Sequence, residues 1–551
     1  MKHYAKFLFA DFETTGLKYF NKHGFTKVYL AGLTDLLGNF QHFKSIDEFY
    51  NFLKDNCREH TIVYFHNLKF DFSFLEYFFT VEKIPYIKKC NEMGRIISAE
   101  ISFNIIIKKA KRLIKKDISI QFRDSLLLLN GSLDELAKSF GLPYKISKDQ
   151  EFYDREIYKT TDEEITYLMR DVEILKDLIK LLFEKYQIAK DPPLTAPSLA
   201  RSILFENCIE RERHNKLFNC PFSLDQKLRP YYYGGFCYVN PKYQGKIIEN
   251  VSGIDVNSFY PSIMAYETLI YGIPKEIEGY QVDDIFTYFY IVKINCELKP
   301  NKHPYILKKG FMDKNNYITV SDGDIEIGLW DFEIEMVKSR YECYTFEILK
   351  SYRFSRMCKN IFTNFLKQLY QAKQTTQGAE KQFNKLLINS LYGKYGQNQV
   401  SRTHIFTNFF EPETYQETYQ TTSYLPLAMF ITAKARFILN THIDKFGDNF
   451  IYCDTDSIYF KDKISSTIKL SKELGEWDLE HNQETGIFLG QKIYKIGIMN
   501  KMVGLNKKAQ VNLTLEDYQI GKTFEAANLK QKKVLGGCIL VPQDFQIKNR
   551  G

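Results

Sequence analysis

Short apolar runs that end in acidic residues recur along this chain. The run YCDTDSIY at 452–459 places Asp454 and Asp456 between β-rich stretches, and it predicts two strands joined by a tight turn. Residues two apart in extended chain point to the same side, so both carboxylates are expected at one hairpin tip. Such close like charges favour a cation between them, and Mg²⁺ prefers oxygen ligands. A lone DxD is more often a solvated turn, so a metal site here requires another carboxylate.

Four acidic residues lie within the strands and helices predicted for the first part of the chain. Two share a face of a strand predicted near residues 6–12, and one opens a helical stretch after a strand predicted at 61–65. The fourth lies in a helix predicted for 161–178, where a tyrosine four residues earlier shares its face. Carboxylates that hold two metal ions clamp the oxygens of a phosphodiester during hydrolysis. The predicted ligands are Asp11, Glu13, Asp71 and Asp171, with Tyr167 orienting the attacking water.

The order DxE, Asn-x3-Asp and Tyr-x3-Asp resembles the three motifs of the DEDD 3′–5′ proofreading exonucleases, over roughly residues 5–180. The resemblance implies an RNase H-like domain. We assign Lys148 to offset charge on the scissile phosphate, with Lys145 as a rival and a solvated surface lysine as the alternative. Side chains predicted to hold a single-stranded 3′ end are His66, Asn67, Phe70, Ser125 and Leu126, with core packing as the alternative for Phe70 and Leu126.

A further acidic residue follows an apolar run in the middle of the chain. Residues 251–254 predict a buried strand that leads into Asp255. Asp255 and Asp456 on adjacent strands could bridge two Mg²⁺ ions, with the Val256 carbonyl oxygen as an extra ligand. Asp454 would support them from the hairpin. This is the additional carboxylate that the DxD hairpin needs.

Residues 381–393, KQFNKLLINSLYG, have a helical period with basic and polar residues on one face. Such a face offers ammonium groups to a triphosphate, and an amide and a ring to sugar and base. A tyrosine five residues after Asp255 is spaced to lie under the incoming sugar and to exclude a 2′-hydroxyl; packing is the alternative for this ring, and a solvated basic face is the alternative for the helix. The predicted nucleotide-binding residues are Tyr260, Lys373 (on or just before this helix), Lys385, Asn389 and Tyr392.

The motifs DxxSFYPS, KxxxNSxYG and YCDTDS, in that order, resemble those of family B DNA polymerases. The compact length and the run KQTTQGAEKQFNKLLINSLYGKYG are similar to the protein-primed subgroup of small bacteriophages and linear plasmids. Three shorter motifs resemble DNA contacts of the family: a YxGG segment, TAKAR with Ala435 where glycine is usual, and KIY. The DNA-contacting residues that this resemblance implies are Tyr232, Gly234, Gly235, Arg436, Lys492 and Tyr494.

The resemblance implies an α/β multidomain fold with an N-terminal exonuclease domain and a right-hand polymerase of palm, fingers and thumb. In relatives, a first insertion docks a terminal protein that provides the priming hydroxyl, and a second closes a ring around DNA. The implied ranges are exonuclease 1–190, palm 191–266 and 426–500, first insertion 267–360, fingers 361–396, second insertion 397–425 and thumb 501–551. The boundary near residue 190 also follows from Asp191-Pro192-Pro193, which disfavours helix.

Composition limits the class of protein further. A chain of 551 residues is too long for one core, and 44% hydrophobic with 26% charged residues is typical of a globular protein. The net charge of +8 permits a polyanionic partner. The ten cysteines have no metal-binding spacing, which fits a reducing cytosol. The N-terminus does not resemble a signal peptide and no run is apolar enough to span a membrane, so we expect the cytoplasm, of a host cell if the gene is viral or plasmid-borne.

We therefore predict a DNA-directed DNA polymerase with 3′–5′ exonuclease activity that starts from a terminal protein. The expected cofactor is Mg²⁺, two ions per site, with Mn²⁺ as a substitute. The expected partners are DNA template and primer, dNTPs, a terminal protein and a single-stranded-DNA-binding protein. Two alternatives stay open: an RNA-templated polymerase such as a reverse transcriptase, disfavoured by KxxxNSxYG and the nuclease half, and a DNA-binding replication factor with dead sites, disfavoured by the intact carboxylates.

Overall fold

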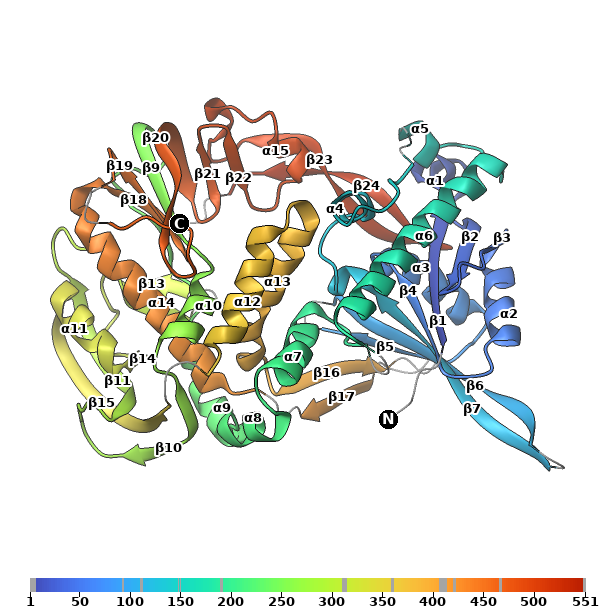
Figure 1. The fold of residues 1–551 in the computed structure, drawn as a ribbon. Coiled ribbons are helices and arrows are strands. Elements are labelled where there is room, and N and C mark those ends of the chain that lie inside the picture. Colours follow the sequence, from blue (N-terminus) through green and yellow to red (C-terminus); the bar gives the residue numbers. More distant parts are fainter. Residues whose placement is uncertain are drawn as a thin grey trace.

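The computed structural model describes residues 6–91, 94–109, 112–146, 148, 150–188, 192–309, 315–357, 361–405, 414–419, 423–464 and 468–548. Within these ranges the chain forms three sheets of four or more strands, with helices between and around them (Figure 1). The boundary predicted near residue 190 falls at 189–191, outside the described residues. Within the described ranges, no helix combines the length and the apolar character that crossing a bilayer requires.

The first sheet has seven strands in the order β3-β2-β1-β4-β7-β6-β5. Strand β4 pairs in parallel with β1 and β7, and the remaining pairs are antiparallel. The strands are β1 (Lys6–Thr14), β2 (Val28–Asp35), β3 (Gln41–Phe43), β4 (Thr61–Phe65), β5 (Tyr86–Cys90), β6 (Ile96–Lys109) and β7 (Arg112–Asp124). The helices of this part are α1 (Leu17–His23), α2 (Ile46–Asn56), α3 (Leu68–Val81), α4 (Leu133–Ser139), α5 (Gln150–Tyr153) and α6 (Asp162–Lys185), with a 3-10 turn at Ser125–Leu127.

Local sequence explains the two elements that matter most in this part. All five residues of β4 are buried, as expected for a central strand with parallel neighbours and covered faces. Helix α6 begins with a capping box in which Thr161 and Glu164 satisfy each other's backbone N–H groups. Its buried stripe, which includes Tyr167, Leu168 and Asp171, packs against β1 and β2. Helix α6 therefore places Asp171 against β1.

The second sheet also has seven strands, in the order β22-β21-β20-β9-β19-β18-β8. These strands are β8 (Cys237–Val239), β9 (Ile247–Val256), β18 (Phe450–Asp454), β19 (Ser457–Lys461), β20 (Trp477–Gly490), β21 (Ile493–Ile496) and β22 (Met499–Met502). The predicted hairpin at 450–460 is thus present as β18 and β19, and β9 is the neighbour of β19. Residues more than two hundred positions apart in the sequence therefore meet in this sheet.

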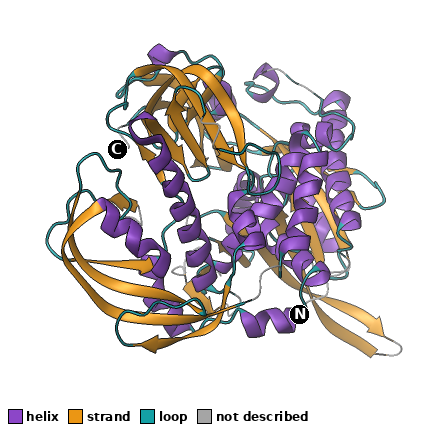
Figure 2. Cartoon of the chain, turned by 60° about the vertical axis from the view of Figure 1, so that its left-hand side comes forward, coloured by secondary structure: helices purple, strands orange, loops and turns teal. Residues whose placement is uncertain are grey.

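The third sheet lies within residues 270–356, in the order β10-β15-β11-β14. It comprises β10 (Ile270–Ile277), β11 (Phe286–Leu298), β14 (Ile325–Trp330) and β15 (Tyr341–Arg356), with α11 (Asp331–Arg340) and the pair β12 (Leu307–Lys309) and β13 (Asn315–Tyr317) beside it. The long buried helix α14 (Leu425–Phe446) contacts α11 and β10 of this unit and β19 of the second sheet. Figure 2 shows the sheets as separate groups of strands with helices packed between them.

A helix pair, α12 (Thr363–Thr375) and α13 (Gly378–Tyr395), stands between the sheets (Figure 1). Our prediction placed Lys373 on or just before the helix of Lys385. Lys373 lies just before that helix, near the end of α12, because the chain turns at residues 376–377 and Gly378 takes a positive φ of 55°. Helices α7 (Ala196–Asn207), α8 (Arg211–Leu217), α9 (Phe222–Leu228) and α10 (Phe259–Tyr266) complete the region around the pair.

Two hairpins from later parts of the chain contact the first sheet or the helices beside it. Strands β16 (Val400–Ile405) and β17 (Thr414–Tyr419) lie in the predicted second insertion, of which residues 406–413 and 420–422 are outside the described residues; β16 contacts β5. Strands β23 (Thr523–Val534) and β24 (Gly537–Gln546), preceded by α15 (Lys507–Gln510), reach α3. At the tip of this C-terminal hairpin, the Leu535 carbonyl accepts from Thr26 N–H at 2.9 Å, and a Cβ on Gly536 would lie 1.8 Å from the Thr26 carbonyl oxygen.

Candidate active sites

The first sheet brings three of the predicted carboxylates together. Asp11 and Glu13 lie on β1 and Asp171 on α6, and carboxylate oxygens of all three are within 4.8 Å of one another. Asp71 lies nearby on α3 and is only 3% exposed. Three of the predicted carboxylates thus converge, and Asp71 lies close enough for the charges of Asp11 and Glu13 to act on it.

Burial and mutual repulsion perturb this cluster. Burial, with the charge of Asp171 added, raises the pKa of Asp11 to about 7. Burial, followed by the charge of Asp11, raises the pKa values of Glu13 and Asp71 well above their ordinary range. Carboxylates perturbed in this way are typical of sites that hold a cation or exchange a proton.

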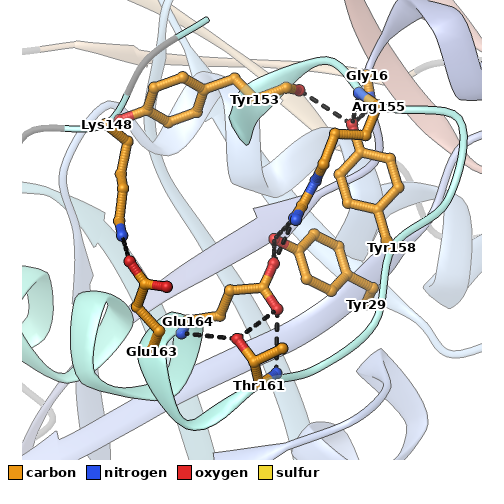
Figure 3. Close-up of polar contacts among 9 residues, drawn as sticks. All are labelled: Gly16, Tyr29, Lys148, Tyr153, Arg155, Tyr158, Thr161, Glu163 and Glu164. Carbon is orange, nitrogen blue, oxygen red and sulfur yellow. Dashed lines mark hydrogen bonds and ion pairs between the residues drawn. The ribbon is translucent and has the colours of Figure 1, made fainter. Parts of the chain in front are cut away.

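The structure favours Lys145 over Lys148 as the lysine of this cluster. Lys145 Nζ donates to Asp171 Oδ2 at 2.6 Å, and its charge opposes the upward pKa shifts of Asp11, Glu13 and Asp171. Lys148 instead points to the exposed Glu163 (Figure 3). The structure therefore does not support the assignment of Lys148. This lysine lies three residues after Lys145, and its ammonium group faces the solvent-exposed side of α6.

A strap at residues 152–158 holds a second tyrosine against Tyr167. The Tyr153 and Tyr167 hydroxyls lie 2.9 Å apart, and the Tyr167 side chain is buried. The Tyr158 hydroxyl accepts from Gly16 N–H at 2.8 Å and from Arg155 N–H at 3.0 Å, and donates to the Tyr153 carbonyl at 3.0 Å (Figure 3). This arrangement fixes the strap across the end of β1.

The buried carboxylate of Glu164 holds the same strap in place. Glu164 is 2% exposed and receives the Arg155 guanidinium and, at 3.1 Å, the Tyr29 hydroxyl, while it also caps α6 through Thr161 (Figure 3). One side chain therefore sets both the start of α6 and the position of the strap, and through them the position of Tyr167.

The five side chains predicted to hold a 3′ end differ in exposure. His66 Nε2 donates to the Gly131 carbonyl at 2.9 Å, so Nδ1 accepts from the Ser125 hydroxyl, also at 2.9 Å. Ser125 is fully buried, so its hydroxyl is not available to a phosphate, contrary to our prediction. Asn67 is exposed, and His66, Phe70 and Leu126 are half-buried.

The second sheet brings Asp255 and Asp456 to one place. Asp255 on β9 lies opposite Ser457 on β19, and Asp456 immediately precedes that residue in the turn. Burial, then the charge of Asp456, raises the pKa of Asp255 to about 8. Burial, then the charge of Asp454, raises the pKa of Asp456 to about 6. The neighbouring strands thus place the predicted carboxylates within each other's field.

Asp454 has a different partner from the one we expected. Both of its carboxylate oxygens accept from Lys492 Nζ, at 2.6 and 2.8 Å. Lys492 therefore neutralises a carboxylate beside the site, whereas we predicted that it contacts primer DNA. The Tyr494 ring is 5% exposed, and its hydroxyl lies 3.2 Å from that of Tyr459, while its contact with DNA stays a prediction.

The helix pair points two lysines at this second site. Lys385 is exposed on α13, and its charge opposes the upward pKa shifts of Asp255 and Asp456. Lys373 Nζ donates to Ser258 Oγ at 3.0 Å, and burial together with the charge of Lys385 lowers the pKa of Lys373 to about 8. Two cations therefore face two carboxylates across the site.

Two tyrosine rings close the side of this site. The rings of Tyr260 on α10 and Tyr392 on α13 have centroids 4.2 Å apart, and both side chains are half-buried. Asn389 lies one turn earlier on the same face of α13, as the sequence predicts.

The YxGG segment packs against the DTD turn. A Cβ on Gly235 would lie 2.5 Å from Thr455 Oγ1 and 2.9 Å from the Tyr260 hydroxyl, so only glycine fits there. Gly234 faces open space, and the Tyr232 ring lies against Gly396 at the end of α13. This segment touches both the turn and the helix that carry the site.

Arg436 supports that segment from within the protein. It is 5% exposed, and its Nη1 donates to the Tyr233 and Gly234 carbonyls, each at 3.0 Å. Glu333 lies 3.6 Å from its guanidinium group. In this structure these donors bind the protein, and the contact of Arg436 with a phosphate stays a prediction.

Comparison with known proteins assigns the chain to a family. The family described as DNA polymerase type B, organellar and viral, matches residues 56–155 and 144–471. The chain belongs to this family. It is a DNA polymerase of the phi29 type and hence a nucleotidyltransferase, which confirms the family inferred from the motifs.

Relatives and solved structures agree with this assignment. The polymerase is 28% identical over 595 residues to the DNA polymerase of Bacillus phage M2, across 98% of this chain and 100% of the relative. It is 26% identical to that of Streptococcus phage Cp-1, across 98% of each. Its fold matches phi29 DNA polymerase complexed with primer-template DNA and incoming nucleotide substrates, with a TM-score of 0.85 at 26% identity over 98% of this chain and 100% of that one.

Residues of this polymerase that sequence reasoning missed are Tyr153, Arg155 and Glu164. The capping-box spacing of Thr161 and Glu164 was readable in the sequence, but the strap was not, since no local pattern says that Tyr153 returns to Tyr167. The Asp454–Lys492 pair was also missed, although both residues lie in motifs that we had singled out.

The residues of the first cluster fit divalent metal ions. Three carboxylate groups converge, and their oxygen atoms are the ligand type that Mg²⁺ prefers. Among the described residues, Asp171 Oδ1 is buried without a hydrogen-bond partner, a position that a cation would satisfy. In the second cluster Asp255 and Asp456 offer the same donor chemistry, while Asp454 is already paired with Lys492.

Proposed function

We propose that this polymerase is DNA-directed and carries a separate 3′–5′ exonuclease site. The observation that supports this proposal is the presence of two carboxylate clusters, one beside each seven-stranded sheet and each with lysines of its own. Asp11, Glu13, Asp71 and Asp171 form one cluster, and Asp255 with Asp456 forms the other. Each could act on a phosphodiester without the other.

In the synthesis site, the 3′ hydroxyl of a primer attacks the α-phosphate of a dNTP and pyrophosphate leaves. Lys385 and Lys373 offset the charge that develops on the leaving pyrophosphate. Tyr260, held by Tyr392, forms the floor under the sugar and excludes a 2′-hydroxyl. Asn389 lies on the same helix face and contacts the nucleotide.

In the exonuclease site, water attacks the terminal phosphodiester of a single strand. Tyr167, fixed by Tyr153 and the strap, orients that water. Lys145 offsets charge on the scissile phosphate, because its ammonium group lies against the cluster. The exposed Asn67 and the half-buried His66, Phe70 and Leu126 line the approach of the strand.

Both clusters would hold Mg²⁺, two ions per site, with Mn²⁺ as a substitute. The ligands would be Asp11, Glu13, Asp71 and Asp171 in one site, and Asp255, Asp456 and the Val256 carbonyl in the other, with Asp454 as a ligand only after release from Lys492. When bound, such ions act as Lewis acids on the phosphate and lower the pKa of the attacking oxygen.

We also propose that this polymerase starts from a terminal protein and replicates a linear phage or plasmid genome. The unit at 270–356, an appended sheet with its own core, is where the motif resemblance places the docking site for that protein. The named relatives are DNA polymerases of phages. Incubation with a candidate priming protein, labelled dNTP and Mg²⁺ should give a covalent protein–nucleotide adduct.

Reciprocal variants test the two-site proposal. Asp456→Ala should abolish dNTP incorporation on a primer–template and leave 3′-end degradation unchanged. Asp11→Ala combined with Glu13→Ala should do the reverse. Loss of both activities in either variant, with the fold intact by circular dichroism, would contradict separate sites. Extension by the Asp456→Ala protein would remove that residue from the synthesis site.

A further inference from the structure

Two cysteines lie opposite each other in the third sheet, outside both carboxylate clusters. Cys296 on β11 and Cys343 on β15 are register partners on adjacent antiparallel strands. Cys296 is fully buried, and the half-buried Cys343 packs against the same apolar core. Both are free thiols in this structure. Neither has a part in the two proposed active sites.

A β-bulge in β15 creates this pairing. Asn295 lies opposite Thr345 before the bulge. The next residue, Cys296, lies opposite Cys343, so Tyr344 is the extra residue of the bulge. Without the bulge, Tyr344 would oppose Cys296, and Cys343 would point to the other face of the sheet. Instead the Tyr344 side chain is 62% exposed and Cys343 packs on the core side, so the bulge brings both thiols to one face.

The backbone of Cys296 shows which kind of strand pair this is. Its N–H donates to Ser321 Oγ at 2.9 Å, and its carbonyl oxygen accepts from Ser321 N–H, also at 2.9 Å. Both backbone groups of a strand residue point to the same side, so those of Cys296 point away from β15. Cys296 and Cys343 are therefore a non-hydrogen-bonded pair, in which Cα atoms lie about 4.5 Å apart and side chains are closest. A disulfide requires a Cα separation of about 4.4–6.8 Å, which this kind of pair satisfies.

The surroundings of the two thiols give them different reactivity. Burial raises the pKa of Cys296 to about 11, and the neighbouring Cys343 adds to that rise. Burial also raises the pKa of Cys343, but the charges of Lys299 and Lys338 oppose that rise. The thiolate is the reactive form, and nearby cations favour it. Because Cys343 is also the more exposed of the two, an external reagent is expected to react there first.

We propose that Cys296 and Cys343 form a redox-modification site, which a low-molecular-mass disulfide converts to a cross-strand disulfide that fastens β11 to β15. The Cys343 thiolate attacks one sulfur of the reagent, a mixed disulfide forms, and one thiolate leaves. Cys296 then loses its proton and attacks the Cys343 sulfur, and the second thiolate of the reagent leaves. Two protein thiols are thereby oxidised, and one external disulfide is reduced to two thiols. In a reducing compartment the pair stays a dithiol, and the bond forms when the thiol pool becomes oxidised.

The bond would act on the segment that connects the third sheet to α14. Residues 297–342 lie between the two cysteines and contain β14 and α11. At the end of α11, Arg340 is 1% exposed and donates to Asn440 and to Asp444 of α14, each at 2.8 Å. Cys343 follows Arg340 by three residues. A bond at Cys343 would therefore hold β15 in the register that places Arg340 against α14.

The test uses the full-length protein and oxidised glutathione. Reduced protein is incubated with the reagent, the remaining thiols are alkylated, and the ten cysteines are mapped by proteolysis and mass spectrometry. We expect a peptide in which Cys296 is joined to Cys343, the loss of two alkylation sites, and reversal by dithiothreitol. Cys296→Ser should stop at the mixed disulfide and keep one glutathionyl group on Cys343. The experiment needs neither DNA nor a nucleotide, so its outcome is independent of the proposed function.

The matched control is another pair of cysteines on neighbouring strands. Cys237 on β8 and Cys453 on β18 are offset by one register position, so their side chains lie on opposite faces of the second sheet. These two should not become joined. The proposal is overturned if Cys296 and Cys343 stay separate, if the parent protein keeps glutathione on Cys343, or if Cys237 and Cys453 join as readily.

Hydrogen exchange provides a second measurement. Amides of β11 and β15 should exchange severalfold more slowly in the cross-linked protein than in the reduced protein, because the bond restricts local opening of the two strands. Cys343→Ser treated with the same reagent should show no such change. Equal exchange in cross-linked and reduced parent protein would show that the bond does not fasten the sheet, and would overturn that part of the proposal.

Discussion

Lys145→Met is expected to remove most of the proposed 3′–5′ exonuclease activity while DNA synthesis continues. Lys145 Nζ lies 2.6 Å from Asp171 Oδ2, and the Asp171 side chain is 1% exposed. Methionine has a similar shape without the charge, so the packing over the Tyr167 ring, now 5.2 Å from the ammonium group, is largely kept. The change therefore isolates the electrostatic contribution.

The size of the effect follows from the contact. Two unit charges about 4 Å apart interact by about 4 kcal/mol at an effective dielectric of 20. Lys145 is 29% exposed, so solvent screening leaves about 2–3 kcal/mol. If that charge acts equally on the transition state, the rate falls by about 10²-fold. In addition, the pKa values of Asp11, Glu13 and Asp171 rise when their cation is removed, which favours protonated carboxylates at neutral pH.

The assay is degradation of a 3′-labelled single-stranded oligonucleotide under single-turnover conditions with Mg²⁺. dNTP incorporation by the same preparation serves as the internal standard. Lys148→Met is the matched control, because its partner Glu163 is 76% exposed and such surface pairs contribute about 0–1 kcal/mol. Degradation by Lys145→Met within threefold of the parent would refute the reasoning, as would an equal loss in Lys148→Met.

Three further changes test other contacts. Gly235→Ala forces a Cβ to 2.5 Å from Thr455 Oγ1, so primer extension should fall and unfolding free energy should drop by about 1–3 kcal/mol, measured by denaturant titration. Lys492→Met removes two hydrogen bonds from Asp454 and should slow dNTP incorporation about tenfold; an unchanged rate would mean that the pair is not used. Burial lowers the pKa of His66 to about 4 from an ordinary 6.5. Between these two pH values His66 is protonated in the unfolded chain and neutral in the folded chain. Up to about 3 kcal/mol of stability is lost as pH falls from 6.5 to 4, and His66→Gln should flatten that decline in thermal denaturation.

The elements around both sites could be predicted because their patterns are local. The strand at 61–65 is present with the predicted bounds, and the hairpin predicted at 450–460 is present with a shorter turn and one further residue at its end. The helix expected at 161–178 runs to Lys185, since its apolar stripe continues beyond the point where we ended it. Convergence of the acidic residues also followed from sequence, because each stands at the end of a strand or on a buried helix face.

The contacts that could not be predicted concern side chains whose partners are distant in the sequence. Arg436 binds backbone two hundred residues away, and Lys492 pairs with a carboxylate on another strand. Neither partner leaves a local pattern. Lys145 and Lys148 are three residues apart with the same chemistry, and only the turn of the chain before the strap decides which of them faces Asp171.

The C-terminal hairpin has a consequence for how the molecule holds together. Its tip bonds to Thr26, Gln531 donates to Ser73 at 2.8 Å, and Lys533 pairs with Glu76 at 2.7 Å. The C-terminal hairpin is therefore bonded to the N-terminal part of the chain. Removal of the last thirty or so residues would expose Phe74, which lies beneath Gly537, and would destabilise the helix that supplies Asp71. Truncation at the C-terminal end should therefore first destabilise the N-terminal part of the protein.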